Sequence, residues 1–337
     1  MDFAIKNIVI ATVIFGTILV IIFENRNPVK TIAWCMVLTF MPVIGLLLYI
    51  LFGMDNRHRR QIKDEDLSRL KGITEITQSD DILSEMPVPQ KPLADMLSKM
   101  NKSFLLSGND VEIITDFQTM SDRLIADIEG ARHHINMLFF KFEDDAAGRR
   151  IADALIRKSE EGVQVRLIYD DAGNLMVPRR FYRKLRKHGI QVRGFIRIFL
   201  PILSRDYNSR NHRKVVVIDG RVGYMGGMNI AQRYAEGLKW GIWRDTHMRI
   251  TGPAVSELQT SFLTDWKFTK GDEPDLAPMY PYNPPCGNTL MQIVTGGPMD
   301  KWNVMMQAYM TAIASARHHA YLQSPYFIPP EPIMKTL

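Results

Sequence analysis

The feature that most constrains the fold of this chain is the concentration of its apolar residues at the amino terminus. Two uninterrupted apolar runs without a charged residue, 8–23 and 31–52, lie before Gly53. As α-helices, the second run of 22 residues would span roughly 33 Å, enough for a bilayer core, and the first run of 16 roughly 24 Å. Because only the short segment Glu24–Lys30 separates them, the runs predict a two-helix transmembrane hairpin at 1–53.

Positive charges follow the second run closely. Arg57, Arg59, Arg60 and Lys63 lie on this flank, so the positive-inside rule places it and everything after it in the cytoplasm. Two cations in the connection between the runs weaken that contrast. A signal peptide is the alternative for the first run, but no A-x-A cleavage site follows it.

Downstream of the hairpin, strand-like and helix-like segments alternate. Strands are expected at 111–115, 135–142 and 163–169, with helices between them at 120–129 and 146–161. This alternation predicts an α/β domain built in layers.

The chain also contains an internal repeat. The string Ala-Arg-His-His occurs at 131–134 and again at 316–319, each time after a helix-like segment and before an apolar run. A separation of about 185 residues is too long for a solenoid and indicates a duplicated domain; chance similarity is the alternative. The resulting division is a juxtamembrane connector at 54–107, a complete first domain at 108–270, a Pro-rich linker at 271–287, and at 288–337 the beginning of a second domain, truncated after one helix and one strand.

One segment, 207–234, concentrates residues suited to phosphodiester chemistry. His212 and Lys214 are two positions apart where the β-branched run Lys214–Ile218 begins, so on a strand their side chains leave the same face. A neutral imidazole nitrogen can attack phosphorus while an ammonium holds a non-bridging oxygen. We therefore expect both residues to be catalytic.

Other positions of this segment could support that chemistry. Gly226 and Gly227 would let backbone N–H groups approach a phosphate, and Asn229 could donate a hydrogen bond to it. Asp219, which completes the motif, has the opposite parity to His212, so we expect it to brace the strand end and the turn at Gly220. No metal cluster with recognisable ligand spacing is present in the sequence, and neither a metal nor a cofactor is expected.

A nucleophilic imidazole needs an acceptor on its far nitrogen, which fixes the tautomer. Asp245 opens the strand-like segment 246–251 and is the candidate for this role. An ion pair with the neighbouring Arg244 at the strand end is the alternative.

Together these segments resemble the bacterial cardiolipin synthases of the phospholipase D superfamily, and the similarity runs from the hairpin to Leu337. The residues that carry it are Tyr169-Asp-Asp171, Arg210-Asn-His-Arg-Lys-Val-Val-Val-Ile-Asp219, Gly223-Tyr-Met-Gly-Gly-Met-Asn229, Trp243-Arg-Asp-Thr-His247 and Gln323-Ser-Pro-Tyr-Phe327. The resemblance implies a phospholipase D-like mixed sheet flanked by helices, behind the two-span amino terminus that is typical of this family.

The resemblance also implies an activity. Members of the family join two phosphatidylglycerol molecules into cardiolipin and release glycerol; one histidine becomes phosphatidylated, and the histidine of a second motif protonates the leaving glycerol. His212, Lys214 and Asp219 match the first motif, and nothing in this sequence matches the second. We therefore expect the isolated chain to be inactive or nearly so, unless two copies pair their motifs in a homodimer.

The expected partners are phosphatidylglycerol and anionic membrane lipid, at a bacterial cell membrane with the catalytic part on the cytoplasmic side. Two alternatives remain open: a membrane-tethered phospholipase D-type phosphodiesterase, and a truncated remnant without activity. The basic segment 178–188 could contact anionic headgroups or form a solvated helix face. No nucleic-acid partner is expected, because of the two predicted spans and the lack of interleaved aromatic residues suited to base stacking.

Overall fold

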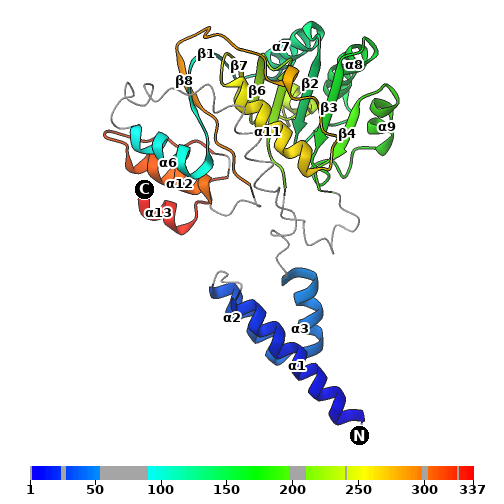
Figure 1. The fold of residues 1–337 in the computed structure, drawn as a ribbon, viewed down its shortest axis with the longest axis vertical. Helices are drawn as coiled ribbons and strands as arrows, with labels where there is room; N and C mark the ends of the chain where they lie inside the picture. The colour runs from blue at the N-terminus through cyan, green and yellow to red at the C-terminus, as the bar shows by residue number, and fades with distance from the viewer. Residues whose placement is uncertain are drawn as a thin grey trace. The chain divides into compact units, whose positions relative to one another are not determined.

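The structure is a computed structural model that describes residues 2–23, 28–53, 90–196, 210–239, 241–297, 303–324 and 326–337. The chain forms two compact units (Figure 1). The first unit comprises Met1–Arg59 and Ile198–Ser209, and the second comprises Arg60–Arg197 and Arg210–Leu337.

The first unit is helical where it is described. Its elements are α1 (Asp2–Phe23), α2 (Pro28–Phe40), α3 (Pro42–Leu48) and the π-helical turn η1 (Tyr49–Gly53). A small core of Ile21, Leu38 and Tyr49 holds these elements together, and the Trp34 and Tyr49 rings meet edge to face at 5.5 Å.

The structure corrects the prediction of two membrane-spanning helices at 8–23 and 31–52. We find no helix among the described residues that combines the length and the apolarity needed to cross a bilayer. The second run is not one helix, because α2 ends at Phe40 and α3 starts at Pro42. Proline has no N–H to donate and its ring clashes with the carbonyl four residues earlier, so it suits the first turn of a new helix.

In the described part of the second unit, eight strands form one mixed sheet in the order β4-β3-β2-β5-β6-β7-β1-β8. The strands are β1 (Leu105–Ile114), β2 (His134–Phe139), β3 (Gln164–Tyr169), β4 (Gln191–Gly194), β5 (Lys214–Ile218), β6 (Val222–Gly226), β7 (His247–Thr251) and β8 (Thr289–Gln292). Neighbours β2, β3 and β4 run parallel, and the remaining pairs are antiparallel. The predicted α/β class with a mixed sheet is therefore confirmed.

The helical elements of this unit are α6 (Lys91–Asn101), α7 (Phe117–Gly130), α8 (Ala146–Glu160), α9 (Arg179–Lys187), α10 (Gln232–Glu236), α11 (Val255–Phe268), the 3-10 turn η4 (Ala277–Met279), α12 (Val304–Ala314) and α13 (Glu331–Thr336). Helices α7 and α8 cover one face of the sheet and α11 covers the other, whereas α12 packs against α6 and α13. Side chains alternate between the two faces of β5, so the hydrophobic core has two parts. Val216 and Ile218 pack toward α7 and α8, and Val215 and Val217 pack toward Leu258 of α11. Figure 1 shows α11 across the face opposite α7 and α8.

The expected elements agree with the structure apart from their ends. Helix α7 begins three residues earlier than predicted, because Asp116 caps it by accepting a hydrogen bond from the Thr119 N–H at 2.8 Å. The strand expected at 135–142 ends at Phe139.

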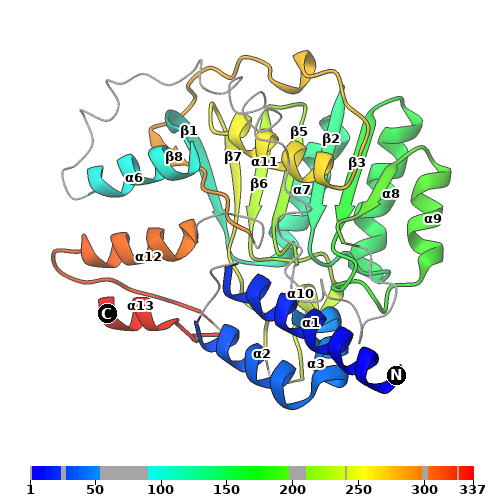
Figure 2. The same cartoon turned by 60° about the horizontal axis from the view of Figure 1, so that its bottom comes forward.

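Several elements that pack with the sheet lie outside the predicted range of the first domain, 108–270. Helix α6 and the start of β1 fall in the predicted connector, of which residues 54–89 lie outside the described residues. Strand β8 falls in the segment predicted to begin a separate domain, yet it pairs with β1 in the same sheet, with Leu105 opposite Gln292. Figure 2 shows β8, α6 and α12 together on the side of the sheet away from α9. The apolar run after the second Ala-Arg-His-His string forms no strand in its described part.

The register brings several strand ends together. Phe139 lies opposite both Tyr169 on β3 and Lys214 on β5, and Gly226 lies opposite His247. We call this end, with the carboxyl ends of β2, β3 and β6 and the amino ends of β5 and β7, the site end of the sheet.

Candidate active site

His212 and Lys214 lie together at the site end. Lys214 is the first residue of β5 and is only 2% exposed, whereas His212, two residues earlier, is exposed. The Lys214 Nζ is 3.2 Å from the His212 Nδ1 and donates a hydrogen bond to the His212 carbonyl oxygen at 2.6 Å. The Phe140 ring packs against both, with its centroid 4.6 Å from the imidazole and 5.4 Å from the ammonium.

The protonation states of the pair follow from this environment. Burial lowers the pKa of Lys214 to about 8, against the opposing charges of Asp245 and Asp170. Partial burial, and then the nearby Lys214 cation, lower the pKa of His212, while Asp245 opposes them. At neutral pH the site therefore presents a neutral imidazole beside an ammonium, which is the combination that attack on a phosphodiester requires.

The residues on either side of His212 are anchored to α11. Asp265, near the end of that helix, is 4% exposed and accepts hydrogen bonds from Asn211 Nδ2 at 2.8 Å and from Arg213 Nη1 at 2.7 Å. Because the Asn211 and Arg213 side chains both turn toward α11, the His212 side chain between them is directed elsewhere.

Asp170, which follows β3, also fixes the backbone next to His212. This carboxylate is 1% exposed; it accepts from the Asn211 N–H at 2.9 Å through Oδ2, and from the Ala172 and Gly173 N–H groups at 3.0 and 3.1 Å through Oδ1. Burial raises its pKa, and the three N–H donors oppose that shift. Asp170 thereby joins the end of β3 to the backbone just before His212.

Asp170 and Asp265 were not predicted as site residues. Asp170 could have been predicted, because it is part of the Tyr-Asp-Asp string that carries the family resemblance. Asp265 gave no signal in the sequence, since it is an ordinary acidic residue on a helix.

Asp219 lies at the opposite end of β5. Its oxygens accept hydrogen bonds from the backbone N–H groups of Arg132, His133 and His134 at 2.7, 2.8 and 2.8 Å. Its own φ is 53°, in the left-handed region. Asp219 therefore holds the start of β2 to the end of β5 and contacts neither His212 nor Lys214.

The glycines make room for neighbouring side chains. A Cβ on Gly226 would come within 2.7 Å of the His247 Nδ1, and a Cβ on Gly227 within 2.0 Å of the Asp245 Oδ1. The Gly227 N–H donates to the Thr246 carbonyl at 2.8 Å, and its predicted contact with phosphate stays a prediction.

Asn229 is also committed within the protein. It is 4% exposed, donates to the Tyr234 hydroxyl at 2.8 Å, and accepts from the Lys141 N–H at 3.1 Å. These contacts tie the end of β6 to the chain after β2, and the predicted contact of Asn229 with phosphate stays a prediction.

Asp245 lies against Gly227 and close to His212 and Lys214, where its charge raises the pKa of both. Its Oδ1 accepts from the Thr246 N–H at 2.7 Å. Within the described ranges, no hydrogen bond joins Asp245 to His212 and no ion pair joins it to Arg244, the alternative partner.

A second histidine, His247, is the first residue of β7 at the site end. It was not predicted as a site residue. It is 1% exposed, and neither ring nitrogen has a hydrogen-bond partner among the described residues. Burial and the Lys214 charge lower its pKa to about 3, so the ring is neutral. Among those residues no group of side chains could hold a metal ion.

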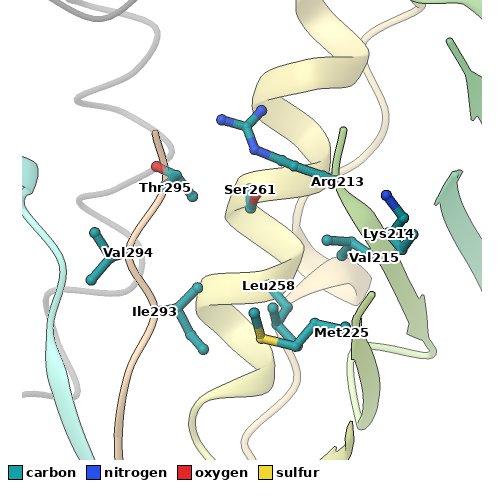
Figure 3. Close-up of a pocket in the computed structure, with 10 residues that line it drawn as sticks. Arg213, Lys214, Val215, Met225, Leu258, Ser261, Ile293, Val294 and Thr295 are labelled. Atoms are coloured by element: carbon teal, nitrogen blue, oxygen red, sulfur yellow. The ribbon is translucent and has the colours of Figure 1, made fainter. Parts of the chain in front are cut away.

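A pocket of about 290 Å³ opens on the α11 face of the sheet. Figure 3 shows its lining side chains, among them Val215, Met225, Leu258 and Ile293. Arg213 and Lys214 also line it, so the pocket reaches the amino end of β5.

This sheet and its imidazole–ammonium pair define the chain as a phospholipase D-type protein. The family model described as "Cardiolipin synthase, PLD-like domain" matches residues 124–266, and "Phospholipase D-nuclease N-terminal" matches 12–53. The major cardiolipin synthase ClsA of Bacillus subtilis is 36% identical over 99% of this chain and 70% of its own length. A cardiolipin synthase of Oceanobacillus iheyensis is 35% identical over 94% of this chain and 68% of its own length. The chain belongs to the cardiolipin synthase family.

Solved structures of lower similarity include phosphatidylserine synthase from Haemophilus influenzae. It is 18% identical and covers 57% of this chain and 45% of its own, with a TM-score of 0.41. The phospholipase D family member Nuc from Salmonella typhimurium is 20% identical and covers 48% of this chain and 94% of its own, with a TM-score of 0.36.

Proposed function

We propose that this chain carries a phosphatidyl-transfer site of cardiolipin synthesis, which takes the phosphatidyl group from one phosphatidylglycerol and passes it to a second. The observation that supports this most is the neutral His212 imidazole 3.2 Å from the buried Lys214 ammonium. The relatives named cardiolipin synthase supply the substrate class.

In the first step, His212 Nε2 attacks the phosphorus of phosphatidylglycerol. The new bond is N–P, the bond that breaks joins phosphorus to the glycerol oxygen, and the Lys214 ammonium stabilises the charge on the non-bridging oxygens. The leaving oxygen takes a proton, which in this family comes from the histidine of a second motif. We propose a second copy of this chain as one source of that histidine. In the second step, a hydroxyl of another phosphatidylglycerol attacks phosphorus and gives its proton to that second histidine. The N–P bond breaks, and His212 is released.

The ground-state geometry implies a rearrangement before attack. An ammonium can only donate, so the contact between Lys214 and His212 Nδ1 leaves the ring proton on Nε2. When a phosphate enters, Lys214 moves from the ring to a phosphate oxygen. The ring proton can then lie on Nδ1, with Asp245 as the acceptor that we propose for it, and Nε2 becomes the free nucleophile.

The first unit suits attachment to a membrane. Large apolar side chains along its helices are exposed, including Phe15 at 63%, Ile32 at 60% and Val43 at 64%. An apolar surface of this extent is stable in contact with lipid. The cytoplasmic position of the second unit, inferred from the cations at 57–63 in the sequence, stays a prediction.

Hydrolysis is the second candidate activity, because His212 is exposed and water could reach a phosphatidyl group bound to it. Both activities share the first step and differ in the acceptor. The ratio of cardiolipin to phosphatidic acid among the products separates them.

The test is transfer of label from phosphatidylglycerol labelled in its phosphatidyl part to the full chain. The reaction is stopped in denaturing detergent at alkaline pH, where an N–P bond survives. We expect label on the wild type and on the control His188→Ala, whose imidazole pairs with Glu160 far from the site, and none on His212→Ala. Label that persists on His212→Ala would overturn the proposal, as would product formation by that variant at the wild-type rate.

A further inference from the structure

Two loops at the site end hold large apolar side chains out into solvent. In the loop between β3 and α9, Met176 is 98% exposed and Leu175 is 47% exposed. In the loop between α10 and β7, Ile242 is 89% exposed. Single exposed apolar residues are common on protein surfaces, so the position of these three matters more than their exposure.

The loops flank His212 on either side. Strands β3 and β7 lie on opposite sides of β5 in the sheet, and the first loop leaves the carboxyl end of β3 while the second enters the amino end of β7. Asp170 joins the first loop to the backbone of Asn211, immediately before His212. The apolar tips therefore surround the candidate active site.

The first loop is held in shape from within the protein. Its backbone is fixed by the contacts of Asp170 with Ala172 and Gly173, and by Asn174, which is 5% exposed and donates to the Phe140 and Asp170 carbonyls at 2.7 Å. Met176 and Leu175 are thus displayed by an ordered turn.

The second loop is anchored in a similar way. Leu238 and Gly241 exchange backbone hydrogen bonds at 2.8 and 2.9 Å, and the Trp243 ring packs 5.4 Å from that of Tyr234. Ile242 lies between these two anchors with its side chain in solvent.

Cations surround the apolar tips. Five exposed ones have no ion pair with any described residue: Arg179, Arg180 and Arg183 on α9, and Lys239 and Arg244 in the second loop. The nearby acids Asp144 and Glu143 pair with cations of their own, Arg149 and Arg233. The five cations outnumber the other acids of these loops and of α10, namely Asp170, Asp171, Glu236 and Asp245. The site end thus offers an excess of positive charge beside apolar side chains, the combination that binds anionic lipid surfaces.

We propose that these two loops and the amino-terminal half of α9 form a lipid-docking rim, which seats the site end on the surface of an anionic bilayer. Leu175, Met176 and Ile242 enter the boundary between headgroups and acyl chains, and the arginines and lysine contact lipid phosphates. The inference rests on the proposed function in one respect, that the substrate is a lipid of the same bilayer. His212 then faces the layer in which a phosphodiester substrate lies.

Insertion of the rim can be measured without turnover. The full chain, with Cys35 and Cys286 replaced by serine, receives an environment-sensitive fluorophore at Met176→Cys. The matched control is Tyr282→Cys, since Tyr282 is 77% exposed beside the Gly220 turn at the other end of the sheet. In phosphatidylglycerol vesicles we expect a blue shift at position 176 and several-fold weaker quenching by iodide, a smaller effect in phosphatidylcholine, and neither change at 282.

Equal iodide quenching at 176 and 282 in phosphatidylglycerol vesicles would overturn the proposal. Protection of position 176 without lipid would overturn it too, because it would show that protein, such as a second copy, covers the rim. Since this readout needs no catalysis, a failure of the proposed chemistry leaves it intact and is recognised separately by the labelling of His212.

A kinetic measurement gives a second test. The double variant Met176→Gln and Ile242→Gln is assayed on phosphatidylglycerol in vesicles and on a short-chain analogue dispersed as monomers. We expect the ratio of the vesicle rate to the monomer rate to fall several-fold relative to wild type, and Tyr282→Gln to keep the wild-type ratio. An unchanged ratio in the double variant contradicts the docking rim.

Discussion

Asp265 binds the Arg213 guanidinium through both carboxylate oxygens, each 2.7 Å from Nη1. The side chains are 6% and 27% exposed respectively, so the pair is partly desolvated. Because Asp265 also holds Asn211, it fixes both neighbours of His212 and acts as a positioning residue for the imidazole.

We predict that Asp265→Asn lowers the free energy of unfolding by about 2–3 kcal/mol, because a half-buried guanidinium loses its counter-charge. It should also reduce kcat by about tenfold or more with little change in KM, because the His212 side chain loses its fixed direction. Chemical denaturation and initial rates measure the two effects.

Asp95→Asn is the control for this prediction. Asp95 pairs with Lys99 at the same 2.7 Å, but both side chains are exposed, so the loss of unfolding free energy should stay below about 0.5 kcal/mol. Equal losses in the two variants would contradict the positioning role.

The pH dependence of catalysis follows from the Lys214 and His212 pKa values. His212 must be neutral to attack, so the rate should rise with pH as the solution passes its pKa, which lies below the usual 6.5. Lys214 must be charged, so the rate should fall as the pH rises through about 8. In Lys214→Arg the guanidinium stays charged, so we expect a lower maximum without the fall near pH 8. A profile of kcat/KM against pH decides this, and an unchanged alkaline limb in Lys214→Arg would assign it to another group.

The proximity of His212 and Lys214 could be predicted from the sequence because the reasoning there was local. Alternation along a strand puts residues two positions apart on one face, and this holds for His212 and Lys214 in any sheet. The roles of Gly227 and Asn229 were not predictable in the same way, because their partners come from β7 and from the chain after β2. Asp265 was not predictable at all, since its importance depends on how α11 packs against β5.

The fold shows the same division between local and tertiary information. The order of strands and helices followed from local patterns, and the break at Pro42 was readable in principle because proline ends a helix by itself. The pairing of β8 with β1 could not be read, because a register between residues some 180 positions apart is set by packing.

Asp219 offers a test of the structural part of the motif. We expect Asp219→Ala to lower the free energy of unfolding by about 2–3 kcal/mol, because three backbone N–H groups lose their acceptor and alanine resists a φ of 53°. Asp219→Asn should cost less, about 1 kcal/mol, because asparagine keeps one acceptor oxygen and tolerates this φ. Denaturation in urea ranks the variants, and Asp116→Ala, which removes one helix cap, gives the scale of about 1 kcal/mol. A larger loss in Asp219→Asn than in Asp219→Ala would contradict the bracing role.

Gly227→Ala tests the position of Asp245. The new Cβ would lie 2.0 Å from the Asp245 Oδ1, so the carboxylate must move away from the catalytic pair. We expect kcat to fall by about 100-fold, as small misplacements of supporting groups often do. Gly130→Ala is the control, because a Cβ there meets nothing within 4 Å near the end of α7, and it should keep activity and stability. Full activity in Gly227→Ala would mean that Asp245 does not support His212.

Acid stability should depend on His247, which is buried without a hydrogen-bond partner among the described residues. Its pKa is about 3 in the folded chain against an ordinary 6.5, so between these values the unfolded chain binds the extra proton. Stability is therefore lost as the pH falls through this window, by at most about 1.4 kcal/mol per pH unit from this residue. His247→Leu has no imidazole to protonate at this position, so we expect a shallower loss of unfolding free energy between pH 6.5 and 4, measured in urea at each pH.

The control is His318→Leu, since His318 is exposed, and it should keep the wild-type slope of unfolding free energy against pH. A wild-type slope in His247→Leu would mean that the acid sensitivity comes from other groups, of which His134, with a pKa lowered by burial to about 4, is the next to change.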